Sequence, residues 1–385
     1  MSSSATAADR RAGVDEAFFG PRAEEVARLC HAMAERFARG GRLIAVGASP
    51  GARSDVRHVA VEFVHPVIVG KRALPAIGLA DRDAVAALGD LARPEDIVMA
   101  VGTDAPDPEA DAALALAGGR GCLAIDLDPP GDDPFVRQEL AETLYHVLWE
   151  LVHVFFEHRG LLEGREAREG HDSGASAFLY PFLAEQEHDL EAVVDDVRAS
   201  VLMKAGEIAA LRAQTLGDNG EGLAAAAAAI QAATDGGGTV LALGNGGSAT
   251  DAMDAVADLR AAPQGWPSRR ALDLCEDPAI LTAIANDVGV EAIFARQVIA
   301  YGRERDVVLS FSTSGNSANV IAALAEARRR GLTTVAMVGY DGGRVAAEGL
   351  ADIVVITRSQ HIPRIQEAQA SAWHVVRELV ERATP

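Results

Sequence analysis

The feature that most constrains the fold of this chain is an internal repeat, because its two halves carry matching segments in the same order. The segment DVRHVAVEF, at 55–63, aligns with DAMDAVADL, at 251–259. Further along, RQELAETLYHVLWELV, at 137–152, aligns with IQEAQASAWHVVRELV, at 365–380. We interpret the halves as two copies of one domain. The first copy is the shorter, and we expect it to lack both an equivalent of 351–358 and the helical region that precedes Arg303.

Short apolar runs alternate with helical patterns in both copies. This order is typical of an α/β fold in which helices cover both faces of a parallel sheet. Hydrophobic residues make up 49% of the 385 residues, enough for two cores. The predicted limits are a disordered tail at 1–20, a trimmed first domain at 21–160, a Gly-rich linker at 161–180 and a second domain at 181–385.

The composition argues against some classes of binding partner. A net charge of −21 disfavours nucleic-acid binding through a general basic face. The three cysteines are scattered, and neither a signal peptide nor an apolar run that could span a bilayer is evident. The expected location is therefore the cytoplasm, with no membrane partner.

A hydroxyl-rich turn follows an apolar run in the second copy, LSFSTSGNSANV at 309–320. Backbone N–H groups at the start of a helix attract anions, and clustered hydroxyls add donors, so the turn is predicted to bind phosphate. The alternative is an ordinary helix start with Ser317 as its N-cap. A second turn, LGNGGSATD at 243–251, is Gly-rich but matches neither GxGxxG nor a P-loop, so no nucleotide cofactor is expected.

Polar residues recur at matched places on the flanking helices of both copies. Each set could coordinate a divalent metal such as Zn²⁺ or supply a general acid and base. Ordinary buried polar groups with partners are the alternative interpretation. The two sets are His58, Glu62, Gln138 and His146 in the first copy, and Asp254, Asp258, Gln366 and His374 in the second.

Taken together, five segments resemble phosphoheptose isomerase of the sugar isomerase (SIS) domain group. They are LGNGGSATDAMDAVADL, AIANDVG, SFSTSGNSANVIAA, GYDGG and RIQEAQASAWHV. The resemblance covers roughly 181–383. It implies a five-stranded flavodoxin-like sheet and interconversion of sedoheptulose 7-phosphate and D-glycero-D-manno-heptose 7-phosphate through an enediol. The substrate residues that it implies are Asn245, Gly246, Ser248, Asp287, Ser312, Thr313, Ser314, Ser317 and Gln366.

The two copies depart from the family pattern in opposite ways. In the second copy, the family's catalytic Glu is replaced by Asp258 and a family His by Asp254, whereas His374 is kept. The first copy keeps His58, Glu62, Gln138 and His146, but Asp104 and Asp107 stand in place of its phosphate turn. We therefore expect the second copy to bind the sugar phosphate and the first to supply or mimic an acid–base and metal set. The expected catalytic residues are Asp258, His374, Glu62 and His146.

Two further expectations follow from the resemblance. The replacement of Glu by Asp leaves open a non-catalytic phosphosugar sensor or regulatory protein as the alternative function. The family packs subunits through its long first helix, so we expect a homodimer that forms a pseudo-tetramer of SIS domains.

Overall fold

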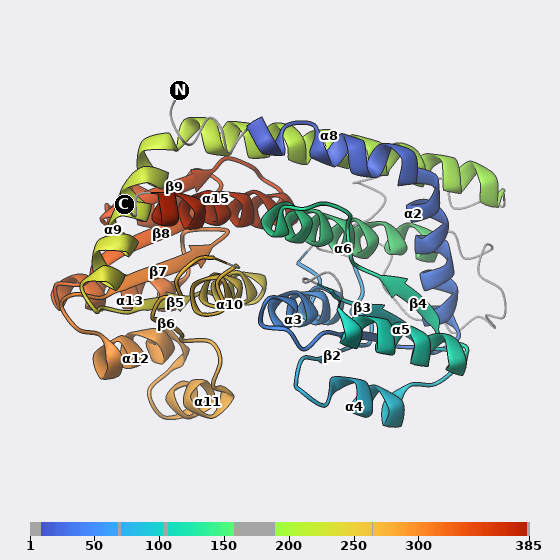
Figure 1. Ribbon diagram of the computed structural model, residues 1–385, viewed down its shortest axis with the longest axis horizontal. Helices are drawn as coiled ribbons and strands as arrows, with labels where there is room; N and C mark the ends of the chain where they lie inside the picture. Colours follow the sequence, from blue (N-terminus) through green and yellow to red (C-terminus); the bar gives the residue numbers. More distant parts are fainter. Residues whose placement is uncertain (1–8, 68–70, 103–106, 158–188, 264, 383–385) are drawn as a thin grey trace. The chain divides into compact units, whose positions relative to one another are not determined.

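The computed structural model describes residues 9–67, 71–102, 107–157, 189–263 and 265–382, and divides into two compact units (Figure 1). The N-terminal unit is Gly13–Glu207, and the C-terminal unit is Ile208–Pro385 together with Met1–Ala12. In the part of the chain that the structure describes, no helix is long and apolar enough to cross a membrane.

The N-terminal unit contains a four-stranded sheet with the order β2-β1-β3-β4, in which every pair is parallel. Its elements are α2 (Val14–Ala38), β1 (Leu43–Val46), α3 (Pro50–Val64), β2 (Ala76–Leu79), α4 (Ala84–Leu91), β3 (Ile97–Ala100), α5 (Pro108–Arg120), β4 (Leu123–Asp126) and α6 (Pro134–Glu157). Helix α8 (Leu190–Asp218) begins in this unit, and the division between the units falls within it, after Glu207.

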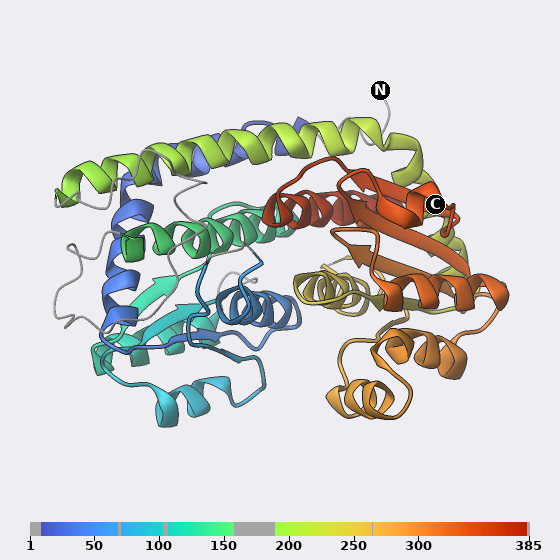
Figure 2. The same cartoon turned by 180° about the vertical axis from the view of Figure 1, so that it is seen from behind.

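The C-terminal unit contains a five-stranded parallel sheet with the order β6-β5-β7-β8-β9, seen from behind in Figure 2. Its elements are α9 (Gly220–Asp235), β5 (Val240–Leu243), α10 (Gly247–Arg260), β6 (Ala271–Asp273), α11 (Pro278–Asp287), the 3-10 helix η2 (Val290–Ala292), α12 (Ile293–Tyr301), β7 (Val307–Ser312), α13 (Ala318–Arg329), β8 (Thr333–Gly339), α14 (Gly343–Ala347), β9 (Ile353–Thr357) and α15 (Ile362–Arg382).

The central strands are buried on both faces, as a parallel sheet between two helix layers requires. In β5, Val240 and Ala242 join the core that includes residues of α9, α10 and α15. The alternate residues Leu241 and Leu243 join the core on the other face, with residues of α12 and α13. The period of two along the strand thus divides its side chains between two cores.

Each sheet has a point at which the chain reverses the direction in which it adds strands. In the C-terminal unit this point lies between β5 and β7, which pair directly although β6 comes between them in the sequence. In such sheets, ligands bind at the carboxyl ends of the strands beside the reversal. The turns after β5 and β7 are therefore the part of the fold where a ligand site is expected.

The α/β fold with two parallel sheets, and a first copy with fewer strands, were predicted correctly. Among the described residues, the N-terminal unit has no counterpart of β9, and the single helix α4 stands where the C-terminal unit has α11, η2 and α12. The edge strands β2 and β6 were missed by inspection of apolar runs, because they are short and mostly only half-buried.

The predicted limits differ from the observed elements at the N-terminus. Helix α2 begins at Val14, so the later part of the predicted 1–20 tail is helical. Arg11 contacts Glu378 of α15, with 3.3 Å between Nη1 and Oε1. The predicted linker at 161–180 lies outside the described residues, and the domain limits given by the sequence stay a prediction.

Candidate functional site

The hydroxyl-rich turn links the end of β7 to the start of α13. The Gly315 amide donates to Ser312 Oγ at 3.1 Å, and the Asn316 amide donates to Ser314 Oγ at 3.2 Å. Gly315 has a φ of 61°, and a Cβ on it would lie only 2.2 Å from the carbonyl oxygen of Gly342. Glycine is therefore required at this position, both for the backbone conformation and for the close packing of the turn against the residues that follow β8.

This turn has the chemistry of an anion site. A serine oxygen that accepts from a backbone amide can direct its own O–H outward, toward an acceptor such as a phosphate oxygen. Ser317 precedes the first residue of α13, but its side chain makes no capping hydrogen bond. Ser317 therefore does not act as the ordinary N-cap that was the alternative interpretation, and the N-terminus of α13 keeps its attraction for an anion.

The Gly-rich turn after β5 is joined to the hydroxyl-rich turn by a pair of amides. Asn245 Nδ2 donates to Asn319 Oδ1 at 2.9 Å, and Asn319 Nδ2 donates to Asn245 Oδ1 at 2.8 Å. Gly246 has a φ of 58° and precedes α10, and Ser248 is buried in the first turn of that helix. Asn319 was missed from the sequence, where an asparagine within a helix carries no distinct signal.

Two other predicted substrate residues lie on helices α11 and α15. Asp287 is the exposed last residue of α11, and its Oδ1 accepts from Asn286 Nδ2 at 2.7 Å. Gln366 is buried on α15, two turns before His374. The contacts described for Asp287 give it no link to either turn.

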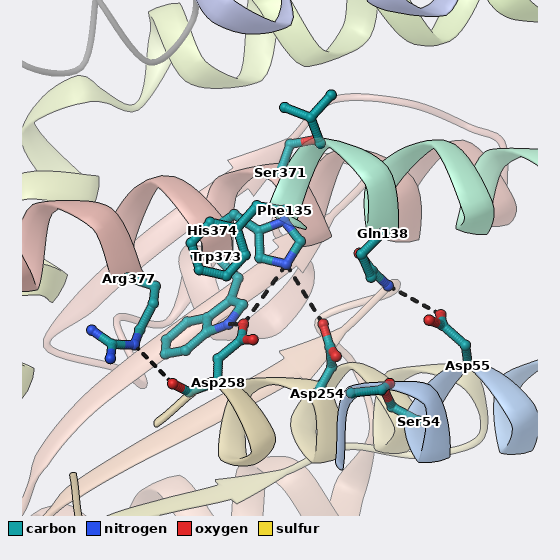
Figure 3. Close-up of polar contacts among 12 residues, drawn as sticks. Ser54, Asp55, Phe135, Gln138, Asp254, Asp258, Ser371, Trp373, His374 and Arg377 are labelled. Atoms are coloured by element: carbon teal, nitrogen blue, oxygen red, sulfur yellow. Dashed lines mark hydrogen bonds and ion pairs between the residues drawn. The ribbon is translucent and has the colours of Figure 1, made fainter. Parts of the chain in front are cut away.

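Helices α10 and α15 bring together the acid–base candidates of the C-terminal unit (Figure 3). His374 Nε2 lies 3.6 Å from Asp254 Oδ2 and 3.7 Å from Asp258 Oδ2. Asp254 and Asp258 are one turn apart on α10, so both carboxylates face the same imidazole. Ligand atoms of the three side chains all lie within 4.8 Å of one another.

Burial changes the proton affinity of this group. Desolvation and the neighbouring Asp254 carboxylate raise the pKa of Asp258 to about 7, although His374 and a hydrogen bond from Trp373 act in the opposite direction. A carboxyl group with such a pKa exchanges its proton near neutral pH, as a general acid or base requires. Trp373 and Arg377, which also contact Asp258, were missed from the sequence because they resemble core and surface residues of an amphipathic helix.

The matched cluster of the N-terminal unit is His58, Glu62 and His146, and all three side chains are buried. His58 Nε2 lies 3.4 Å from His146 Nε2 and 3.8 Å from Glu62 Oε1. The fourth predicted member, Gln138, donates its amide to Asp55 Oδ1 at 3.1 Å (Figure 3). Tyr145, which sequence analysis missed, lies 2.9 Å from His58 Nδ1 and 3.2 Å from Asp55 Oδ1 through its hydroxyl oxygen.

This arrangement fits a divalent cation. When Tyr145 donates to Asp55 and accepts from His58 Nδ1–H, the lone pair of His58 Nε2 faces Glu62 and His146, which is the form in which histidine binds metal. Oε2 of Glu62 is buried and has no hydrogen-bond partner among the described residues. Burial lowers the pKa of His58 and raises that of Glu62 to about 7, so a cation would relieve the cost of the buried carboxylate. Two imidazoles and one carboxylate suit Zn²⁺.

In the N-terminal unit, the helix starts that match these turns carry side-chain caps among the described residues. Ser49 caps α3 by accepting from the Ala52 amide at 3.2 Å. Asp107 caps α5 by accepting from the amides of Glu109 and Ala110, both at 3.1 Å. Asp104 lies outside the described residues. Both helix starts thus carry a side-chain cap, and the cap of α5 is an anion itself.

The known proteins that this chain resembles in sequence match about its C-terminal half. The SIS domain family profile matches residues 205–339. Phosphoheptose isomerase of Pelodictyon phaeoclathratiforme is 42% identical over 178 residues, which span 45% of this chain and 83% of that protein. Phosphoheptose isomerase of Geobacter sulfurreducens is 39% identical over 194 residues, which span 49% of this chain and 98% of that protein.

The whole chain shares its fold with a solved two-sheet structure. The C-terminal domain of glucosamine-fructose-6-phosphate aminotransferase from Francisella tularensis superposes with a TM-score of 0.53, covering 96% of this chain and 95% of that one. The identity is only 11%, so this likeness concerns the fold and carries no information about the reaction.

Proposed function

The chain belongs to the SIS-domain family of phosphoheptose isomerase, and from this premise we propose that its C-terminal unit is an aldose–ketose isomerase that interconverts sedoheptulose 7-phosphate and D-glycero-D-manno-heptose 7-phosphate. The observation that carries the proposal is the pair of turns at the reversal point of the sheet, joined by the reciprocal Asn245–Asn319 amide pair. Such a fixed polar edge is where this class of sheet holds its ligand.

In the proposed complex, the hydroxyl-rich turn holds the phosphate. Its donors are the hydroxyls of Ser312, Thr313, Ser314 and Ser317 together with amides at the start of α13. Asn245, Gly246 and Ser248 of the other turn line the sugar, with Gln366 and Asp287 as further proposed contacts. The serine oxygens of residues 312 and 314 already accept backbone hydrogen bonds, so their O–H groups are free to point toward the ligand.

The proposed reaction moves one proton between two carbons through an enediol. A base takes the proton from the carbon next to the carbonyl, while an acid protonates the carbonyl oxygen; the reverse transfers at the neighbouring positions complete the isomerisation. We assign the role of base to Asp258 and the role of acid, which protonates the carbonyl oxygen, to His374. Their atoms are 3.7 Å apart, and the raised pKa of Asp258 keeps its proton exchangeable near neutral pH.

For the N-terminal unit we propose a Zn²⁺ site formed by His58, Glu62 and His146, with Gln138 as the fourth predicted ligand. When bound, the metal would supply a Lewis acid and a local positive charge. Glu62 and His146 are the second acid–base pair that the sequence predicts. The alternative metal set is Asp254, Asp258, Gln366 and His374.

Turnover of sedoheptulose 7-phosphate in D₂O, followed by NMR, tests the proposed reaction. The proposal expects the aldose to appear, with deuterium incorporated at the carbon that receives the proton. Stabilisation by the sugar phosphate in thermal melts without any aldose would instead support the alternative, a non-catalytic phosphosugar sensor. The replacement of Glu by Asp258 is the observation that favours that alternative.

We also propose a homodimer that brings four SIS-like domains together. Leu202 and Met203 of α8 are exposed apolar side chains, 40% and 53% accessible, on a long helix that could pack against a second copy. Size-exclusion chromatography with light scattering measures the mass, and a monomer at micromolar concentration would contradict the proposal.

A further inference from the structure

We infer that Trp373 and Arg377 are positioning residues that hold Asp258 in place for catalysis, an inference that rests on the proposed function of this carboxylate. Both residues lie on α15, one turn apart and on the same face as each other, and His374 follows Trp373 directly. One helix therefore carries the proposed acid and both groups that hold the proposed base (Figure 3).

Arg377 holds the backbone of Asp258. Asp258 lies in the last turn of α10, which ends at Arg260, where carbonyl groups have no partner within the helix. Arg377 Nε donates to the carbonyl oxygen of Asp258 at 3.1 Å. A guanidinium at this place both satisfies the carbonyl and complements the negative end of the helix.

The Arg377 side chain is itself fixed from several sides. It is fully buried, its guanidinium lies 4.8 Å from the centre of the Trp266 ring, and its Nη1 contacts Glu381. Glu381 also accepts from Arg269 Nε at 2.8 Å. The guanidinium is thus held between an aromatic ring and a carboxylate, so its bond to Asp258 has little freedom to move.

Trp373 holds the carboxylate of Asp258. The indole Nε1–H donates to Asp258 Oδ2 at 2.8 Å, and the indole is almost wholly buried. The Asp258 side chain is 16% accessible, and the same Oδ2 atom lies 3.7 Å from His374 Nε2. The indole bond therefore fixes the oxygen that faces the proposed acid.

The matched positions of the N-terminal unit carry different side chains. Tyr145 matches Trp373 in the repeat, and its hydroxyl contacts His58 and Asp55. Trp149 matches Arg377, and its indole nitrogen is buried without a hydrogen-bond partner among the described residues. Aspartate is about one methylene shorter than glutamate, and a displacement of about 1 Å can cost 10²-fold in rate. The two contacts hold the shorter Asp258 side chain facing His374.

The central experiment replaces Trp373 by Phe, which removes the N–H and keeps most of the ring. We expect kcat to fall roughly 10- to 100-fold while KM stays within about twofold, because the phosphate turn is untouched. Trp149→Phe is the matched control, a buried indole whose loss removes no hydrogen bond, and should leave kcat nearly unchanged. When Asp258→Asn is already present, adding Trp373→Phe should lower kcat little further, because Trp373 acts through the Asp258 carboxylate.

An NMR measurement of the Trp373–Asp258 contact tests the inference without requiring enzyme turnover. In ¹H–¹⁵N spectra, Asp258→Ala should move the indole signal of Trp373, assigned by its loss in Trp373→Phe, and leave that of Trp149 in place. An unmoved Trp373 signal, or a kcat of Trp373→Phe equal to that of Trp149→Phe, would overturn the inference. If the unaltered protein turns over no sugar phosphate, the proposed function fails, and the indole signal alone decides whether Trp373 holds Asp258.

Discussion

The N-terminal and C-terminal units build the same kind of parallel sheet but carry different side chains at matched places. In the C-terminal unit, the helix starts of α10 and α13 carry no side-chain cap, and the cluster holds two carboxylates and one histidine. The N-terminal unit has side-chain caps on the corresponding helix starts and a cluster of two histidines and one carboxylate. The scaffold therefore fixes where a site can form, and a few side chains at matched positions decide which chemistry it supports.

The difference between the clusters is one of charge. Asp254 and Asp258 are two carboxylates beside one imidazole, and the Asp254 carboxylate raises the cost of ionising Asp258. In the N-terminal unit, the single carboxylate of Glu62 faces two imidazoles, a donor set for a cation. We propose that the C-terminal cluster holds a proton and the N-terminal cluster holds a metal ion.

The largest expected effect concerns the proposed acid. His374→Ala should lower kcat about 10²–10⁴-fold, the range that loss of a general acid or base produces, with sugar-phosphate binding retained. The matched variant His146→Ala should lose bound metal instead. Steady-state kinetics with metal analysis checks both, and a reversed pattern would break the division between the units.

The next effect concerns the turn after β7. Gly315→Val should weaken sugar-phosphate binding roughly 10- to 100-fold, because it adds about 1–3 kcal/mol of strain at a positive φ and a clash with the Gly342 carbonyl. In the N-terminal unit, Gly102→Ala is the control, since a Cβ there meets only side-chain atoms at 3.5 Å or more. Isothermal titration calorimetry compares the two, and equal affinities would contradict the assignment of the turn.

A smaller effect is expected from the Tyr145 hydroxyl, which contacts the proposed metal ligand His58. Tyr145→Phe removes the contact to His58 Nδ1 and should weaken Zn²⁺ binding about 10- to 100-fold. Competition with a chromophoric chelator measures the affinity. Glu62→Gln, which removes a proposed ligand, should weaken it further, and a Zn²⁺ affinity indifferent to both changes would exclude the site.

The smallest effect concerns pH. The pKa of Asp258 is raised from 3.8 to about 7 in the folded protein. Between these two pH values, the carboxyl group is therefore ionised in the unfolded chain but protonated in the folded protein. The free energy of unfolding of the metal-free protein should therefore fall as pH rises from about 4 to about 7. Asp258→Asn should make this fall shallower in urea titrations, as should Glu62→Gln for the other unit. An unchanged slope would contradict the raised pKa.

Most of the fold followed from the sequence because the alternation of apolar runs and helices is strong in both copies. The edge strands escaped because β2 and β6 carry few fully buried residues. The repeat supplied candidate site residues where it aligned titratable groups, as with His146 and His374. Asn319, Trp373 and Arg377 could not be predicted, because their contacts join segments more than 70 residues apart and their residue types suit an ordinary amphipathic helix.

The most direct test of the account is to locate the bound sugar phosphate by hydrogen–deuterium exchange with mass spectrometry. The account predicts that sedoheptulose 7-phosphate slows exchange in peptides that cover residues 311–320, and leaves those that cover the turn at 47–54 unchanged. Protection at 47–54 without protection at 311–320 would contradict it, because the ligand would then occupy the unit whose helix start is already capped.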